Sequence, residues 1–256
     1  MQNKEKLMQK LIDSLSRDNK LEKYIVKRKD IELDVGLVNH YALHNQIPNK
    51  WFDWVRRADS PIMIIGQDWG PYSALQNFID DYKIEKTKDD FDYEKFLFNG
   101  FSSRTEKFII RSLTNNYLRI FNKDITQKDW DLFFFTVAVL LTRKGHLFRG
   151  NDNFEPKVSL SHSYPYLIKQ IEIVDPKLIM PLGGMAWESL AKYFRLDYGK
   201  TITEVINNLP SEGYIKVKDI YIIPNFHPAS HVDPKIIDKQ FAKIWEIVKQ
   251  EGNVRI

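Results

Sequence analysis

Two short polar stretches of this sequence follow apolar runs and contain side chains suited to chemistry. The first is GQD, Gly66–Asp68, and the second is FHPAS, which contains His227. A carboxylate presented between two glycines and beside aromatic residues at the end of an apolar run could be displayed for chemistry. The alternative reading is structural, because Asp68 could cap a helix that begins near Tyr72 and His227 could simply precede a proline turn.

Four short apolar runs separated by helix-like stretches are typical of a buried parallel sheet with crossover helices. The runs are IMII, LFFFTVAVLL, KLIMPL and IYIIP, and a polar turn follows each of them. Because open α/β sheets place their sites at the carboxyl ends of parallel strands, the four turns should converge. Gly183-Gly184 in the third turn lacks the Lys-Ser/Thr of a phosphate-binding P-loop, so we expect it to serve tight packing.

The pattern of these runs predicts the fold class. We expect a three-layer α/β sandwich with a four-stranded, mostly parallel sheet flanked by helices, preceded by a helical N-terminal extension. Residues 1–60 are assigned to the helical region and residues 61–256 to the α/β domain, in one compact domain overall. The last helix should begin after Asp233, with Pro234 in its first turn, and residues 80–96 should form an exposed helix and loop.

Composition limits the classes of function. The 256 residues, 43% of them hydrophobic, suffice for a full core, and the absence of cysteine excludes disulfides, thiol catalysis and cysteine-ligated metal clusters. His40 and His44 lie four apart but have no evident third ligand, so we expect no metal and no cofactor. The net charge of +4 fits a nucleic-acid partner or an ordinary surface. Without a long apolar run or a signal peptide, we expect a cytoplasmic monomer that does not contact membranes.

The order and context of these motifs resemble the uracil-DNA glycosylase superfamily. IIGQD followed by an aromatic-rich turn is similar to its first signature, which reads Gly-Gln-Asp-Pro-Tyr in the best-known branch, and FHPAS is similar to the second, which begins His-Pro-Ser. GFSSRTEKFI looks like the segment that carries the base-stacking phenylalanine, and DPKLIMPLGGMAWESL looks like the third strand and its helix. The resemblance covers roughly residues 61–248. It implies a monofunctional, metal-free DNA glycosylase that acts in base excision repair on a flipped-out base.

The resemblance also implies roles for individual residues. Asp68 would position the attacking water and oppose the positive charge on the sugar, and His227 would donate a hydrogen bond to the departing base. This division suits the chemistry, because cleaving an N-glycosidic bond creates oxocarbenium character on one side and a base anion on the other. The residues implied to surround the base are Gly66, Gln67, Tyr72, Phe101 and Val137. Those implied to hold DNA phosphates are Arg143, Lys144, Ser230 and His231.

Some positions depart from the superfamily pattern. Val137 stands where most members have an asparagine that reads the pyrimidine edge, and a valine cannot make that hydrogen-bonded pair. Should uracil nevertheless be the substrate, Asn225 or a backbone amide would have to read it. His231 is a weak substitute for the apolar wedge of the best-known branch, and the absence of cysteine separates the chain from the iron–sulfur branches. Two functions stay open: excision of uracil or another deaminated or damaged base, or binding of DNA or a nucleotide without catalysis.

Overall fold

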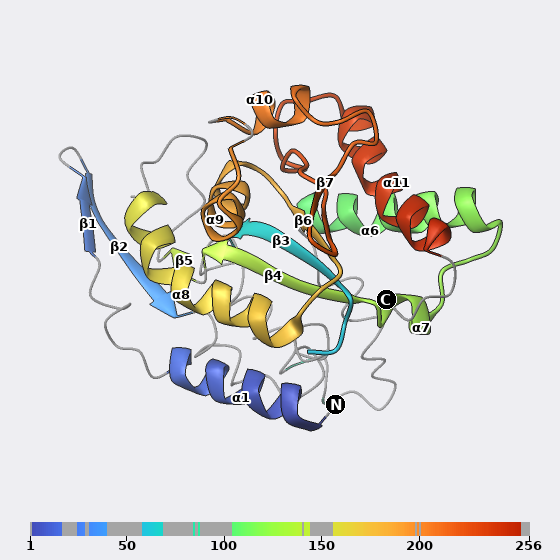
Figure 1. Cartoon of the computed structure of the whole chain (residues 1–256). Helices are drawn as coiled ribbons and strands as arrows, with labels where there is room; N and C mark the ends of the chain where they lie inside the picture. The colour runs from blue at the N-terminus through green and yellow to red at the C-terminus, as the bar shows by residue number, and fades with distance from the viewer. Residues whose placement is uncertain are drawn as a thin grey trace.

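The structure is a computed structural model of the whole chain (Figure 1). It describes residues 2–16, 25–28, 31–39, 58–68, 84, 87, 104–139, 141–143, 156–197, 199 and 201–251.

A five-stranded, mostly parallel sheet forms the centre of the fold (Figure 1). In spatial order its strands are β4 (Phe133–Val139), β3 (Ile62–Asp68), β6 (Leu178–Pro181), β8 (Ile220–Ile222) and β7 (Ile215–Val217). The first four strands are parallel to their neighbours, and β7 pairs antiparallel with β8 at the edge. The predicted α/β fold is therefore confirmed, and each of the four apolar runs supplies a strand of this sheet.

The sheet has one strand more than the sequence predicted. Val217 pairs with Ile220, so Lys218 and Asp219 form the two-residue turn of a hairpin between β7 and β8. Lys218 adopts a left-handed backbone conformation with φ of 56°. Such turns usually carry Asn-Gly or Asp-Gly, and the sequence here offers neither signal.

Helices cover both faces of the sheet because neighbouring strand residues point to opposite sides. On β3, Ile62 and Ile64 pack in one apolar cluster with α6 (Arg104–Phe121) and α11 (Pro234–Gln250). Met63 and Ile65 pack in the other cluster with helices of the opposite layer. That layer consists of α8 (Pro156–Val174), α9 (Gly184–Phe194) and, packed on α8, α1 (Gln2–Ser16). The structure also describes two short helices, α7 (Gln127–Trp130) and α10 (Ile202–Asn207).

The expectation of a helical region through residue 60 is correct for α1 but wrong further along. β1 (Ile25–Arg28) and β2 (Ile31–Asn39) form an antiparallel pair, and β2 also pairs with β5 (Leu141–Arg143) in a separate three-stranded sheet. The segment IELDVGLV alternates apolar and other residues with the period of a strand, a signal that outweighs helical spacing. Arg143 therefore belongs to a strand, and not to a polar turn after β4 as the sequence suggested.

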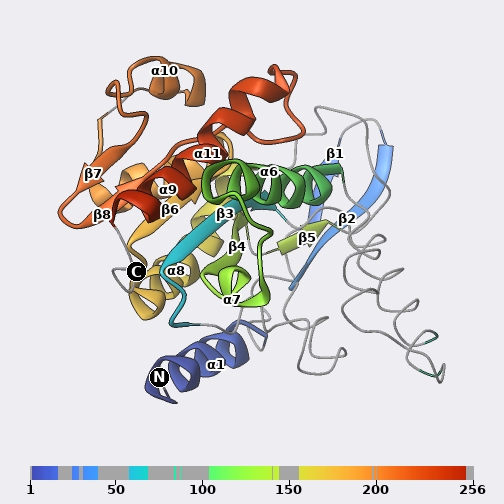
Figure 2. The same cartoon turned by 90° about the vertical axis from the view of Figure 1, so that its right-hand side faces the viewer.

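The α6 and α11 helices lie side by side over the sheet (Figure 2). As predicted, Asp233 caps α11 by accepting a hydrogen bond from the Lys235 amide at 2.9 Å. Further along α11, the indole Nε1 of the buried Trp245 donates a hydrogen bond to the Leu113 carbonyl on α6 at 2.9 Å. The same ring packs edge-on against Tyr117 of α6, with ring centroids 4.9 Å apart. These contacts fix one helix against the other.

Trp245 provides a test of what holds this layer together. Trp245→Phe keeps an aromatic ring but removes the hydrogen bond to Leu113, so we expect the free energy of unfolding to fall by about 1 kcal/mol. Trp245→Ala also leaves a cavity and should lower it by about 3–5 kcal/mol. Urea unfolding followed by circular dichroism measures both values. Equal losses for the two variants would contradict the assignment of most of the energy to packing.

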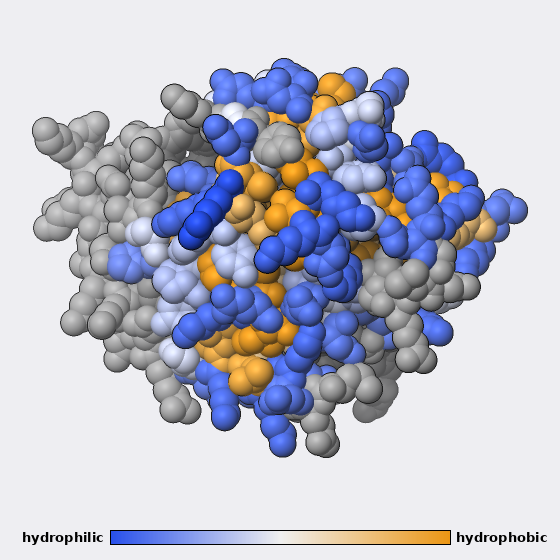
Figure 3. All heavy atoms as spheres, in the orientation of Figure 1, coloured by the Kyte–Doolittle hydropathy of each residue, from blue (hydrophilic) through white to orange (hydrophobic). Residues whose placement is uncertain are grey.

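Hydrophilic side chains cover most of the coloured surface in Figure 3, and apolar side chains gather in smaller patches between them. Within the described part of the chain, no helix combines the length and the apolar character that a membrane crossing requires.

Candidate functional site

The carboxyl ends of four parallel strands lie along one edge of the central sheet, as the sequence predicted. Pairing continues into the turns that follow. The Leu182 amide donates to the Ile65 carbonyl at 2.8 Å, and the Gly183 amide donates to the Asn225 carbonyl at 2.8 Å. The segments that follow β6 and β8 are thereby held in register with each other and with β3. Because β6 alone separates β3 from β8, the backbones of Asp68 and His227 follow strands about 10 Å apart.

Gly183 is the point where these turns meet. A Cβ atom built on Gly183 would lie 3.2 Å from Cβ of His227 and 3.8 Å from Oε1 of Gln67. Gly183 also has φ of 87° and ψ of 178°, a region that essentially only glycine occupies. The structure thus brings together two predicted site residues from distant parts of the chain, and it supports the expectation that Gly183 serves tight packing. Nothing lies within 4 Å of the corresponding position on Gly184.

The orientation of the His227 imidazole sets its chemistry. Nδ1 accepts a hydrogen bond from the Ala229 amide at 3.2 Å, within a turn closed by the Ser230 amide donating to the His227 carbonyl at 2.8 Å. A ring nitrogen that accepts carries no proton, so the neutral imidazole holds its proton on Nε2 and donates from there. The turn therefore favours the tautomer whose Nε2–H can donate to a ligand. The side chain is partly exposed.

Val137 lies opposite Gly66 on the neighbouring strand. The two residues pair in the β3–β4 register, and Cγ1 of Val137 is 3.2 Å from where a Cβ on Gly66 would lie. The side chain is only 5% exposed. The adjacent Thr136 is engaged elsewhere, because its hydroxyl donates to Oε1 of Gln170 on α8 at 2.7 Å. Among the candidates on this strand, position 137 is therefore the one whose side chain abuts Gly66 near the end of β3.

Asn225 has a structural position that the sequence did not indicate. It is completely buried, and its Nδ2 donates to the Ile237 carbonyl in the first turn of α11 at 3.1 Å. This bond ties the end of β8 to α11 and so fixes both ends of the segment that carries His227. A fully buried side chain does not reach a base, which argues against Asn225 as the reader of the substrate.

The structure describes some of the remaining predicted site residues in full, others by their backbone alone, and others not at all. Ser230 and His231 follow His227 in the same turn, where His231 is exposed and the hydroxyl of Ser230 is buried without a hydrogen-bond partner in the part of the chain described. For Asp68 and Arg143 the structure describes the backbone, at the ends of β3 and β5. Tyr72, Phe101 and Lys144 lie outside the described residues, as do His40, His44 and the predicted helix and loop at 80–96 apart from two single positions.

Sequence reasoning predicted Gln67 and His227 as site residues but did not predict that Gly183 packs between them. The one available signal was a Gly-Gly pair directly after a buried strand, which fits a tight approach as well as a phosphate loop. The presence and spacing of the two glycines do not predict which distant residues pack against them.

Comparison with known proteins agrees with this geometry. The sequence pattern of the Uracil DNA glycosylase superfamily matches residues 52–249, which include the whole central sheet and both motif turns. One similar protein is a Type-4 uracil-DNA glycosylase from Sulfurisphaera tokodaii, 33% identical over 90 residues. The aligned part makes up 32% of this chain and only 39% of that protein. On the extent of the superfamily match, the chain belongs to the uracil-DNA glycosylase superfamily.

Proposed function

We propose that this protein is a DNA glycosylase that hydrolyses the N-glycosidic bond of a flipped-out uracil or other deaminated or damaged base. The observation that carries the proposal is the meeting of the GQD segment, at the end of β3, with the His227 turn at Gly183, where Gln67 and His227 both approach the same backbone position. Superfamily membership and the similar Type-4 uracil-DNA glycosylase support the same reaction class.

In the proposed reaction, Asp68 and His227 act on opposite sides of the bond between the base nitrogen and C1′ of the sugar. The base leaves with the bonding electron pair, and Nε2–H of His227 donates a hydrogen bond to the base oxygen that gains negative charge. The Asp68 carboxylate opposes the positive charge on the sugar and orients a water molecule, whose oxygen then bonds to C1′. The water proton passes to the carboxylate or to solvent, which leaves an abasic site.

The remaining site residues are proposed to position the DNA. Gly66, Gln67, Tyr72, Phe101 and Val137 are proposed to surround the base, and Arg143, Lys144 and His231 to contact phosphates. Ser230 was predicted to join them, but its hydroxyl is buried and its amide donates to the His227 carbonyl, so it is not proposed as a direct contact. Near His227 the amides of Ala229 and Ser230 are used within the turn, so any phosphate contact there falls to side chains or to other amides. DNA is thus the proposed partner.

The test of this function is excision from defined oligonucleotides. Duplexes and single strands that each contain one uracil, hypoxanthine, xanthine or oxidised pyrimidine are incubated with the protein, and alkaline cleavage reveals abasic sites. We expect cleavage at one or more of these bases. Tight binding to the same oligonucleotides without any abasic site would instead support the second candidate, a DNA-binding module without catalysis. The presence of valine at position 137, where most members of the superfamily have asparagine, favours this candidate.

Val137 gives a prediction about the choice of base. Val137 abuts Gly66, and the resemblance implies that an asparagine at this position would read a pyrimidine edge. Val137→Asn should therefore raise kcat/KM for uracil relative to hypoxanthine about 5- to 150-fold, which corresponds to about 1–3 kcal/mol. Val137→Leu, which has nearly the shape of asparagine without its hydrogen bonds, is the matched control. Efficient uracil excision by the unchanged protein, with no gain in the Asn variant, would show that another group reads the base.

A further inference from the structure

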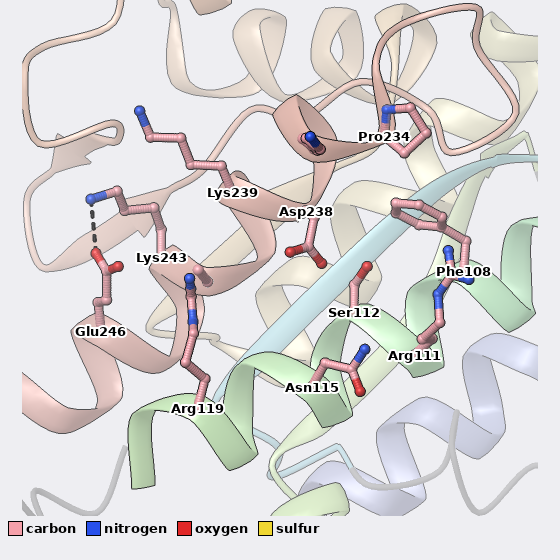
Figure 4. A pocket seen from close by; sticks show the side chains of 12 residues that line it. Phe108, Arg111, Ser112, Asn115, Arg119, Pro234, Asp238, Lys239, Lys243 and Glu246 are labelled. Carbon is pink, nitrogen blue, oxygen red and sulfur yellow. Dashed lines mark hydrogen bonds and ion pairs between the residues drawn. The ribbon is translucent and has the colours of Figure 1, made fainter. Parts of the chain in front are cut away.

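A groove runs between α6 and α11, on the helical layer that begins beside the site. Its main hollow has a volume of about 630 Å³, and α6 and α11 contribute its lining, from Phe108 and Pro234 at one end to Arg119 and Glu246 at the other (Figure 4). A second hollow of about 410 Å³ shares Arg119 and Glu246 and continues to Lys249. Together they follow most of the 17 residues of α11, a length of about 25 Å at 1.5 Å per residue.

The lining of this groove is strongly basic. It contains two carboxylates, Asp238 and Glu246, and a larger number of cations. The cations are Arg111, Arg119, Lys235, Lys239, Lys243 and Lys249. Both carboxylates are already engaged. Oδ1 of Asp238 accepts a hydrogen bond from Asn116 at 3.0 Å, and Glu246 pairs with Lys243 at 2.8 Å. The groove therefore presents an excess of positive charge to solvent.

Among the residues that the structure describes, only Lys243 of these six cations pairs with a carboxylate. Arg119 donates to Asn116 and Lys249 to the Ile120 carbonyl, whereas the side chains of Arg111, Lys235 and Lys239 have no hydrogen-bond or ion-pair partner in that part of the chain.

Arg111 instead lies over the ring of Phe108, with its guanidinium carbon 5.4 Å from the ring centroid. That contact and the packing of Phe108 against Phe241 occupy the ring, so the cations are what the groove offers to a ligand. A positively charged groove is the feature with which proteins follow the backbone of single-stranded nucleic acid.

The groove is formed before any ligand arrives. Asn116, buried on α6, donates to Asp238 on α11 and to the Ser112 carbonyl, and its own Oδ1 accepts from Arg119 at 2.7 Å. With the Trp245 bond to Leu113, these contacts hold the two walls at a fixed separation. A ligand would therefore find the cations already in place and would lose little free energy to ordering the protein.

We propose that this groove binds the backbone of a single strand of nucleic acid that continues from the site. The groove starts at Pro234, three positions after His231 of the proposed site turn, so one strand can pass from one to the other. The axes of packed helices lie about 8–10 Å apart and their side chains fill the space between them, so the groove is a narrow furrow on their outer surface that one extended strand can follow. The inference rests on the proposed function, since that function makes DNA the ligand.

The test compares two pairs of exposed basic residues. Arg111→Ala with Lys239→Ala removes two groove cations, whereas Lys10→Ala with Lys169→Ala removes two cations from α1 and α8 in the opposite helical layer. The probe is a labelled, undamaged oligothymidylate of about 20 nucleotides. We expect the groove variant to bind about tenfold more weakly, and the slope of log affinity against log salt to shrink by about 1.4, or 0.7 for each lost phosphate contact.

The outcomes separate this inference from the proposed function. Loss of oligothymidylate affinity in the groove variant alone supports the groove, even if no base is excised from any substrate. Equal affinity for the groove and control variants overturns it, even if excision is efficient. A groove variant that keeps its oligothymidylate affinity but loses binding to a poly-glutamate peptide also overturns it and assigns the groove to an acidic protein partner. Circular dichroism spectra that match the unchanged protein show that both variants are folded.

Discussion

Replacing His227 by alanine is expected to lower kcat for base excision by about 10²–10³-fold, the loss typical when one donor to a developing anion is removed. The expectation follows from the turn in which Ala229 donates to Nδ1 and leaves the proton of the neutral ring on Nε2. Asp68→Asn should also abolish most turnover, because it removes the charge that opposes the oxocarbenium ion. Both variants should retain DNA affinity within a few fold, measured with an undamaged duplex.

The two residues should also behave as one unit. If they act on the same bond, the double variant should lose little more activity than the worse single variant. His162→Ala, on α8 in the opposite helical layer, is the matched histidine control and should keep its activity. Full activity of His227→Ala, or strictly multiplicative losses in the double variant, would contradict a shared reaction centre.

Gly183→Ala is expected to reduce excision by up to about 100-fold, because small displacements of catalytic groups cost activity on that scale. The added Cβ would meet His227 Cβ at 3.2 Å, closer than most real contacts, so the histidine turn must move. The backbone at φ of 87° also disfavours any side chain, which should lower the free energy of unfolding by about 1–3 kcal/mol. Single-turnover kinetics and urea unfolding measure the two effects separately.

The neighbouring glycine is the control for this experiment. Gly184 is the first residue of α9, and nothing lies within 4 Å of the position that its Cβ would take. Gly184→Ala should therefore leave excision and stability nearly unchanged. Equal losses in the two variants would indicate a general effect on α9, and an active Gly183→Ala protein would show that His227 tolerates the displacement.

The central fold could be read from the sequence because its signals are local. Continuous apolar runs such as IMII require burial on both faces, and in the structure Ile62 and Ile64 face one helical layer while Met63 and Ile65 face the other. The cap and proline that start α11 are equally local. The GQD and FHPAS motifs could also be recognised from the sequence, because each is a short run of neighbouring residues. Their order along the chain was sufficient to indicate the superfamily.

Other features depended on pairing between distant segments, which residue types alone do not encode. The hairpin of β7 and β8 requires a left-handed conformation at Lys218, and the residue types of its turn do not predict one. The β2 strand pairs with β5, which lies about a hundred residues further along the chain. The role of Gly183 exists only because folding brings Gln67 and His227 against it.

The basic groove shows the same division. The lysines and arginines of α6 and α11 could be read from the sequence, but they were scattered over two helices more than a hundred residues apart. Packing around Trp245 and Asn116 aligned them into one surface. The sequence by itself thus determined the four parallel strands, the cap of α11 and which side chains are candidates for chemistry, because these depend on short-range pattern and residue type. Only the tertiary structure decided which of them face one another, because contacts between distant residues are selected by the packing of the whole chain.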